Sequence, residues 1–504
     1  MKPARRPLRL SALLLTLALL TGLLPAASAA SQPAEPVVAA DSAIVIDYDT
    51  GETLYAKDAD TMRVPASMTK VMTAYIIFEE LEAGSLTLDT MVPISDFAAD
   101  ISRNQARYPT AVPLPYGGSL TVDTLLKLIL IPSASASCVA MAEYISGTEA
   151  AFVQRMNATA QRLGMTAQYE NCHGAHVHYL TARSQATLVR EFIRRFPQIL
   201  DYTSMISVTF NGETLANTNQ LLPGAAFAYE GADGFKTGTI NAAGYCLSAT
   251  AVRDGRRVIS VVMHSDNNTT RHTDSIALLD YGFAKLAADA PYADTAFHWS
   301  WQAVEELDAL GVELHPSGIQ FRPNQAVTRA EFTAMLYTAL DQAGALPEPP
   351  EASTAPSETV PPEETAQPAD PAEETEAAPE ETPAQPAPEP EPLFDDISGH
   401  WAQTYIEDAA ALELVEGAGD GGFDPDATLT RQEMMVMVDS FVHLPEANGL
   451  GFADDGDIAL WALEAAARTT AAGLFDGSGG RLSPAATATR AEAAQVVSRV
   501  LELA

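Results

Sequence analysis

Apolar positions along the first half of the chain follow the periods of strands and helices in turn. The run at residues 43–48 predicts a buried strand, and the apolar positions at residues 68–82 predict a helix. Residues 244–252 and 257–264 predict two strands joined across Asp254 and Gly255. Because strands stand at both ends of this region with helices between them, we expect an α/β or α+β domain whose first and last strands share one sheet.

The N-terminus carries a different apolar pattern. Four basic residues precede an apolar run at residues 10–24, and the small residues 26–30 follow it. This order is typical of a secretory signal peptide, which we assign to residues 1–30. A retained membrane anchor is the alternative and needs about 20 apolar residues. No later apolar run is that long, so we expect a secreted protein without a transmembrane anchor once the signal is cleaved.

Length and charge limit the classes of function. A chain of 504 residues exceeds a single core, so two or more domains are expected. It has 29 Lys and Arg against 66 Asp and Glu, a net charge of -37, which argues against nucleic acid or an anionic membrane as a partner. The three cysteines (Cys138, Cys172 and Cys246) are too few for a disulfide framework and suit small buried positions.

A segment rich in Pro, Glu, Ala and Thr interrupts the apolar patterns at residues 346–392. Such a composition cannot bury a core, so we expect a disordered linker. A first domain at residues 38–287 precedes the linker. Shorter regions flank the linker on both sides.

Those shorter regions contain one unit three times, at residues 292–342, 393–444 and 450–504. Each copy contains a Trp, an apolar-x-Pro loop and a Thr-Arg-x-Glu sequence that opens an apolar helix. The Thr and Glu form a capping box. The Arg at the helix start suits an anionic ligand, or alternatively an ion pair with a neighbouring carboxylate. These arginines are Arg329, Arg431 and Arg490.

The first domain contains three motifs that together suggest acyl-transfer chemistry. Ser67 and Lys70 are three residues apart at the start of the predicted helix, so both side chains share one face. A serine there gains from the helix N-terminus, and a lysine acts as its base if burial lowers the lysine pKa. Ser133 follows an apolar helix at residues 125–131, and Lys236-Thr237-Gly238-Thr239 precedes a predicted strand.

The order and spacing of these motifs match the Ser-x-x-Lys, Ser-x-Asn and Lys-Thr-Gly set of penicillin-recognising enzymes. The domain resembles the D-alanyl-D-alanine carboxypeptidases among low-molecular-mass penicillin-binding proteins, and similar stretches occur at residues 50–55, 173–174 and 217–222. The resemblance implies an α+β fold of the β-lactamase and penicillin-binding-protein kind. It also implies peptidoglycan stem peptides as substrates, β-lactam antibiotics as covalent inhibitors and no cofactor.

The resemblance also implies roles for individual residues. Ser67 would attack the penultimate D-alanine carbonyl, with Lys70 as base. Ser133 would relay a proton to the leaving D-alanine. Lys236 and Thr237 would hold the terminal carboxylate, and the N–H groups of Ser67 and Thr239 would form the oxyanion hole.

One residue departs from the family pattern, because Ser135 stands where Asn is expected. A hydroxyl reaches less far than an amide, so a contact to the substrate or to Lys70 would be lost, at about 1–3 kcal/mol. Ser135 thus leaves open a wall-binding protein on an impaired catalytic scaffold. A β-lactamase, which shares the first and third motifs but deacylates through a Glu-bearing loop, is a second alternative. We expect no metal at His173, His176 and His178, whose irregular spacing lacks a fourth ligand.

The three repeats resemble S-layer homology modules. That family binds pyruvylated, anionic secondary polymers of Gram-positive-type cell walls, which implies attachment of this protein to the wall through Arg329, Arg431 and Arg490. Trp299, Trp401 and Trp461 would shape the modules. Three such modules usually form one pseudo-trimeric bundle, but the linker between the first and second argues against that arrangement here.

Overall fold

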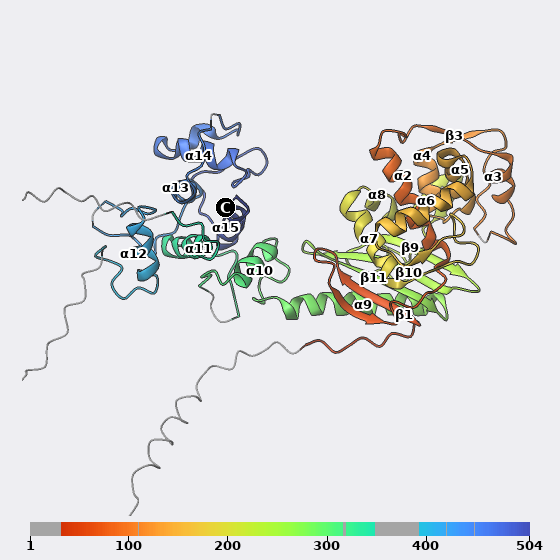
Figure 1. Ribbon diagram of the computed structural model, residues 1–504, viewed down its shortest axis with the longest axis horizontal. Coiled ribbons are helices and arrows are strands. Elements are labelled where there is room, and N and C mark those ends of the chain that lie inside the picture. The colour runs from red at the N-terminus through yellow and green to blue at the C-terminus, as the bar shows by residue number, and fades with distance from the viewer. Residues whose placement is uncertain are drawn as a thin grey trace, which may run out of the picture. The chain divides into compact units, whose positions relative to one another are not determined.

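The computed structural model describes residues 32–108, 110–315, 319–347, 393–419, 421–447 and 449–503. The predicted signal peptide and nearly all of the predicted linker lie outside these ranges. The chain divides into two compact units, residues 1–289 and 290–504, which Figure 1 colours from red to green and from green to blue. No helix in the described ranges combines the length and apolar character needed to cross a membrane.

A five-stranded antiparallel sheet forms the base of the first unit, in the order β2-β1-β11-β10-β9. Its strands are β1 (Ser42–Asp47), β2 (Thr53–Lys57), β9 (Ala232–Ile240), β10 (Gly244–Arg253) and β11 (Arg256–Ser265). The prediction that the first and last strands share a sheet is confirmed, since Ser42 pairs with Met263 across β1 and β11. Asp254 and Gly255 both have positive φ in the turn from β10 to β11, as a tight hairpin requires.

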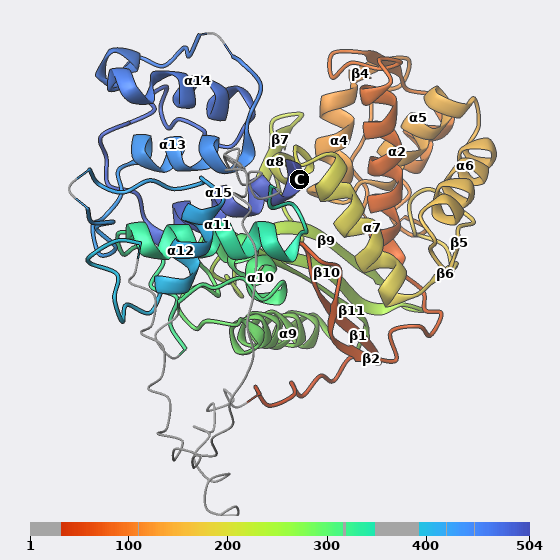
Figure 2. The same ribbon diagram turned by 60° about the vertical axis from the view of Figure 1, so that its left-hand side comes forward.

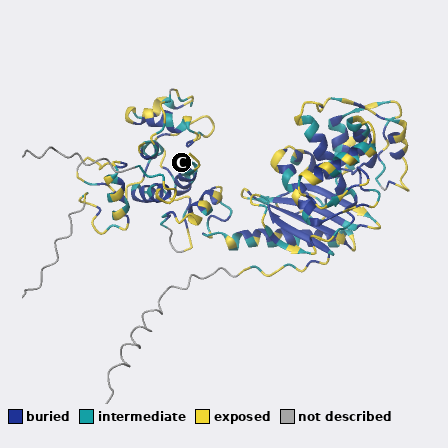
Figure 3. Cartoon of the chain, in the orientation of Figure 1, coloured by how far each residue is buried: buried dark blue, intermediate teal, exposed yellow. Residues whose placement is uncertain are grey.

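Helices cover both faces of this sheet, which explains why β1 is buried along its whole length. The long helix α9 (Asn268–Asp289) lies on one face of the sheet. Helix α7 (Ala182–Arg195) lies on the other face, together with the other helices of the first unit (Figure 2). Figure 3 shows the sheet buried between these layers. The predicted α+β class is therefore confirmed.

The helical layer surrounds α2 (Lys70–Glu82). The first turn of the predicted helix is instead a 3₁₀ turn, η1 (Ala66–Thr69). The other elements of this layer are α3 (Asp96–Ile101), α4 (Val122–Leu130), α5 (Ser135–Ser146), α6 (Glu149–Arg162) and α8 (Ile199–Thr203), with the short hairpins β3–β4 (Met91–Pro93, Ser119–Thr121), β5–β6 (Ala167–Gln168, Tyr179–Leu180) and β7–β8 (Ser207–Phe210, Glu213–Ala216).

The second unit contains a pair of helices from each repeat. They are α10 (Trp301–Ala309) with α11 (Arg329–Gln342), α12 (Gln403–Ala411) with α13 (Arg431–Val442), and α14 (Leu463–Ala471) with α15 (Arg490–Leu503); two 3₁₀ turns, η2 (Asp455–Asp457) and η3 (Leu460–Ala462), precede α14. The predicted capping boxes are present, because each Thr side chain accepts from the Glu backbone N–H and each Glu side chain accepts from the Thr N–H.

The three repeats close into one bundle. Single β-bridges join the first repeat to the third at Ala326–Thr489, the first to the second at Thr328–Thr428, and the second to the third at Thr430–Thr487. One hydrophobic core draws residues from all three repeats, including Phe321 and Phe423. The expectation that the linker opposes a compact bundle was therefore wrong: complementary apolar faces bring the repeats together although the linker separates them in sequence.

Candidate functional site

Ser67 lies on the 3₁₀ turn η1, immediately before α2. Lys70 is the first residue of α2, and its Nζ lies 3.0 Å from Ser67 Oγ. Ser67 is partly exposed, whereas Lys70 is fully buried. The spacing of three residues at the helix start therefore gives the arrangement that the sequence predicted for this pair.

Burial gives Lys70 the properties of a base. It lowers the lysine pKa because the charged ammonium loses its hydration. Nζ also donates to His173 O at 2.5 Å and to Ser135 Oγ at 3.3 Å. These contacts fix the amine next to the Ser67 hydroxyl, and the lowered pKa favours the neutral form that can accept a proton.

Strand β9 runs along the sheet edge next to η1. A Cβ built on Gly238 would lie 2.4 Å from Pro65 O, so only glycine allows the strand to approach the serine turn this closely. Lys236 and Thr237 on this strand are buried and Thr239 is exposed. Thr237 Oγ1 lies 2.6 Å from Thr218 Oγ1. The edge position leaves one side of β9 free for a ligand in an extended conformation.

A third cation, Arg271 on α9, reaches this edge and was missed by our sequence reasoning. It donates to Thr239 Oγ1 at 2.8 Å, and burial lowers its pKa to about 10. Burial, followed by the charges of Lys70 and Arg271, holds the pKa of Lys236 well below its usual value. The available sequence signal was an arginine on the same helical stripe as the buried Leu278 and Leu279, a position that an unpaired surface arginine does not take.

Two serines lie next to Lys70 in the family pattern, Ser133 just before α5 and Ser135 at its start, and only Ser135 contacts the lysine. Ser133 has a φ of 71°, and its buried Oγ has no hydrogen-bond partner among the described residues. Ser135 is the first residue of α5, and its Oγ accepts from Lys70. The expected loss of contact between residue 135 and Lys70 is therefore not seen.

His178 belongs to a buried chain of hydrogen bonds beside the serine turn. Thr69 Oγ1 donates to Ala66 O, and His178 Nε2 lies 2.7 Å from Thr69 Oγ1. His178 Nδ1 lies 2.9 Å from Asn171 Nδ2. Burial lowers the pKa of His178 to about 4, so it is neutral near pH 7. This buried chain holds the loop whose His173 carbonyl contacts Lys70.

The same loop approaches η1 very closely. Gly174 has positive φ, and a Cβ there would lie 1.8 Å from Ala66 O. The stretch at residues 173–174 thus supports the serine turn through its backbone.

A Glu-x-x-x-Asn spacing, the pattern of a deacylating β-lactamase loop, occurs once near this site, at Glu213 and Asn217. Glu213 is exposed on the β7–β8 hairpin. The Asn217 amide donates to the carbonyls of Thr203 and Met205. Neither side chain takes part in the hydrogen bonds around Ser67 and Lys70.

Each of the three repeated arginines donates hydrogen bonds to backbone carbonyls of another repeat. Arg329 donates to Glu416 O and lies over Phe423. Arg431 donates to Leu482 O and Asp476 O and pairs with Glu492 at 2.7 Å.

Arg490 is the most enclosed of the three. It is fully buried, donates to Phe321 O and Leu314 O, and pairs with Glu331 at 2.5 Å. The alternative of pairing with a carboxylate thus describes Arg431 and Arg490, and Arg490 does not reach solvent in this structure.

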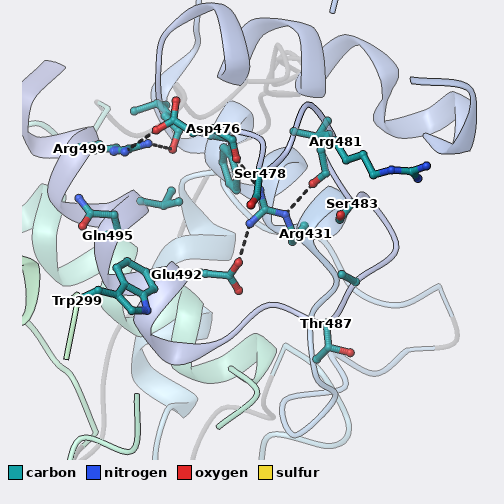
Figure 4. A pocket seen from close by; sticks show the side chains of 15 residues that line it. Trp299, Arg431, Asp476, Ser478, Arg481, Ser483, Thr487, Glu492, Gln495 and Arg499 are labelled. Atoms are coloured by element: carbon teal, nitrogen blue, oxygen red, sulfur yellow. Dashed lines mark hydrogen bonds and ion pairs between the residues drawn. The ribbon is translucent and has the colours of Figure 1, made fainter. Parts of the chain in front are cut away.

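A groove of about 580 Å³ opens beside Arg431 (Figure 4). Trp299, 55% exposed, lies at one side. Arg499 pairs with Asp476, and Arg481 points away from the ion pairs. Hydroxyl and amide side chains complete the polar lining: Ser478, Ser483, Thr487 and Gln495. Aromatic, hydroxyl and guanidinium groups together suit a carbohydrate that bears negative charge.

A serine hydroxyl beside a buried lysine, next to a sheet edge with further cations, is the arrangement of a serine–lysine acyl-transfer enzyme. Residues 27–267 match the D-alanyl-D-alanine carboxypeptidase family. Residues 291–333, 393–435 and 451–494 match the S-layer homology domain.

Two curated relatives and one solved structure illustrate the similarity. The D-alanyl-D-alanine carboxypeptidase DacF of Bacillus subtilis is 34% identical over 261 residues, which cover 50% of this chain and 64% of DacF. The carboxypeptidase DacA of Escherichia coli is 34% identical over 280 residues, which cover 54% of this chain and 69% of DacA. PBP3 of Streptococcus pneumoniae, a solved structure, is 35% identical over 49% of this chain and 73% of its own, with a TM-score of 0.46.

The chain belongs to the D-alanyl-D-alanine carboxypeptidase family and carries three S-layer homology domains. It spans just under two thirds of the length of DacF.

Proposed function

We propose that this protein is a serine-type D-alanyl-D-alanine carboxypeptidase that removes the terminal D-alanine from peptidoglycan stem peptides. The observation that carries the proposal is the 3.0 Å contact between Ser67 Oγ and the Nζ of the buried Lys70. Membership of the carboxypeptidase family supports the same reaction.

The reaction begins when neutral Lys70 takes the Ser67 proton and Ser67 Oγ attacks the carbonyl of the penultimate D-alanine. The N–H groups of Ser67 and Thr239 stabilise the oxyanion. Collapse of the tetrahedral intermediate breaks the peptide bond, and Ser133 delivers a proton to the leaving D-alanine. Water then hydrolyses the acyl-enzyme, and no cofactor is needed.

Cations on the β9 side recognise the terminal carboxylate of the substrate. Lys236 and Thr237 hold it, and Arg271 adds positive charge beside Thr239, to which it donates. Ser135 contributes to the same site through its contact with Lys70. A β-lactam carries a carboxylate next to a strained amide, so it should acylate Ser67 and block the enzyme.

Release of D-alanine tests this proposal. The full-length protein should release D-alanine from muropeptides that end in D-Ala-D-Ala, and Ser67→Ala should release none. Rapid turnover of penicillin without D-alanine release would instead favour a β-lactamase. Absence of both activities would favour a wall-binding protein on an inactive scaffold.

We also propose that the protein is exported and attached to the cell wall through its S-layer homology domains. The ligand would be an anionic, pyruvylated secondary polymer of a Gram-positive-type wall. The groove beside Arg431 supports this assignment, since its exposed Trp299 can stack on a sugar ring and its arginines can hold an acid group. Arg329 lies partly exposed at another junction between repeats. Arg490 contributes by holding the bundle together.

Sedimentation tests the attachment. The full-length protein should pellet with purified wall sacculi and remain in solution after the secondary polymer is chemically removed. Equal pelleting with stripped sacculi would mean that attachment runs through peptidoglycan or another surface.

A further inference from the structure

Lys70 lies between two hydroxyl groups, where the family pattern provides one hydroxyl and one amide. Its Nζ contacts Ser67 Oγ at 3.0 Å and Ser135 Oγ at 3.3 Å. The Ser133 hydroxyl, which the family pattern makes the proton carrier, is buried and contacts no described hydrogen-bonding group. The residue in contact with the base is thus the one that departs from the pattern.

The hydrogen bonds of Nζ limit where protons can go. The His173 carbonyl can only accept, so one N–H is committed to it. A neutral Lys70 then has one N–H and one lone pair for the two hydroxyls. The lone pair must face the Ser67 O–H for Lys70 to act as base, so the remaining N–H faces Ser135 Oγ.

A serine at position 135 can do what an asparagine there cannot. An amide oxygen accepts the Lys70 N–H but has no proton of its own to pass on through that atom. A hydroxyl accepts through its lone pair and still carries one O–H. Within the described part of the chain, the Ser135 hydroxyl accepts from Lys70 and donates to no protein group that the structure records.

We propose that Ser135 is a second proton carrier, which works in parallel with Ser133 during departure of the leaving group. This inference rests on the proposed acyl-transfer function. After attack, Lys70 is an ammonium that holds the former Ser67 proton. As the C–N bond breaks, Lys70 gives one proton to Ser135 Oγ, and Ser135 gives its own hydroxyl proton to the leaving nitrogen. Lys70 becomes neutral again, Ser135 is unchanged, and the amine leaves uncharged.

A double substitution distinguishes proton transfer from simple positioning. In the parent, Ser135→Asn keeps an acceptor for Lys70 while Ser133 carries the proton, so we expect D-alanine release to stay within about threefold of the parent rate. Ser133→Ala alone should lower release about tenfold, because Ser135 still carries the proton. In the Ser133→Ala background, Ser135→Asn should lower release by a further factor of about 100, a typical general-acid contribution.

The leaving group provides the second readout. A thioester substrate expels a thiolate, which needs little protonation, so the double variant should cleave it within about threefold of the Ser133→Ala rate. If the double variant loses the same factor in rate on the peptide and on the thioester, the site is damaged and Ser135 is not a proton carrier. Ser137→Ala, which removes a buried hydroxyl two residues further along α5, is the matched control and should leave both rates unchanged.

Two other results would overturn the proposal. The first is that Ser135→Asn lowers D-alanine release by the same factor in the parent and in the Ser133→Ala background. The second is that Ser133→Ala alone is already as slow as the double variant. Penicillin labelling of the parent at Ser67 is measured first. A parent that is never labelled refutes the proposed function itself, whereas a labelled parent with additive variants refutes only the role of Ser135.

Discussion

Replacing Arg490 by Ala should destabilise the bundle of repeats. The substitution removes the cation from Glu331, which is 4% exposed, and removes the donors to Phe321 O and Leu314 O. Breaking one partner of a buried ion pair costs about 3–5 kcal/mol because the other charge stays buried. The weak 3.9 Å approach of Arg322 to Glu331 compensates little.

Calorimetry of the full-length protein measures this loss. For a unit of this size, each kcal/mol lowers Tm by about 2–4 °C, so the bundle transition should fall by roughly 6–20 °C. The transition of the catalytic unit should not move, which gives an internal control. Arg481→Ala is the matched substitution, because Arg481 is exposed, and should change stability by less than about 0.5 kcal/mol.

A substitution of the partner carboxylate tests whether the buried charge of Glu331 causes the loss of stability. Glu331→Gln keeps an oxygen that can accept from the Thr328 N–H and removes the negative charge. In the Arg490→Ala background it should therefore restore part of the lost stability. A bundle transition within 2 °C of the parent in Arg490→Ala, or no recovery in the double variant, would refute a stabilising ion pair at this position.

Three further results are expected. Gly238→Ala should slow acylation of Ser67 by at least about tenfold, because the new Cβ would lie 2.4 Å from Pro65 O and would push β9 away from the serine turn. Stopped-flow acylation by a β-lactam measures this rate, and a parent-like rate would mean that the two segments separate freely. The acylation rate should rise with pH through the pKa of Lys70, which burial places below the ordinary lysine value, because only the neutral amine is a base; a rate that falls over that interval would exclude this role. Trp299→Ala and Arg431→Ala should each weaken sedimentation with wall sacculi while D-alanine release stays at the parent rate; unchanged sedimentation of both variants would place the polymer elsewhere.

Local patterns were sufficient to predict the main elements. The strand at residues 43–48 and the strand pair around Asp254 were predictable because continuous apolar runs and a tight-turn sequence are short-range signals. The capping boxes were likewise local, since Thr and Glu three residues apart act on one helix turn. The Ser67–Lys70 contact followed from helical spacing alone.

Features that depend on distant segments were not predictable in the same way. Arg271 is 32 residues beyond Thr239 in sequence and reaches it only because α9 packs on the sheet. The burial of Arg490 depends on Glu331 in another repeat. The contact of Ser135 with Lys70 joins residues 65 apart in sequence, which no local spacing rule predicts.

Peptide mapping of the penicillin-treated protein by mass spectrometry tests whether Ser67 is the nucleophile and Lys70 its base. The full-length protein is incubated with penicillin, quenched in acid and digested, and the adduct is located by fragmentation. We expect one penicilloyl group on Ser67, absent from Ser67→Ala and formed much more slowly in Lys70→Ala. An adduct on another residue, or no adduct after prolonged incubation, would contradict the assignment of Ser67 as the nucleophile and Lys70 as its base.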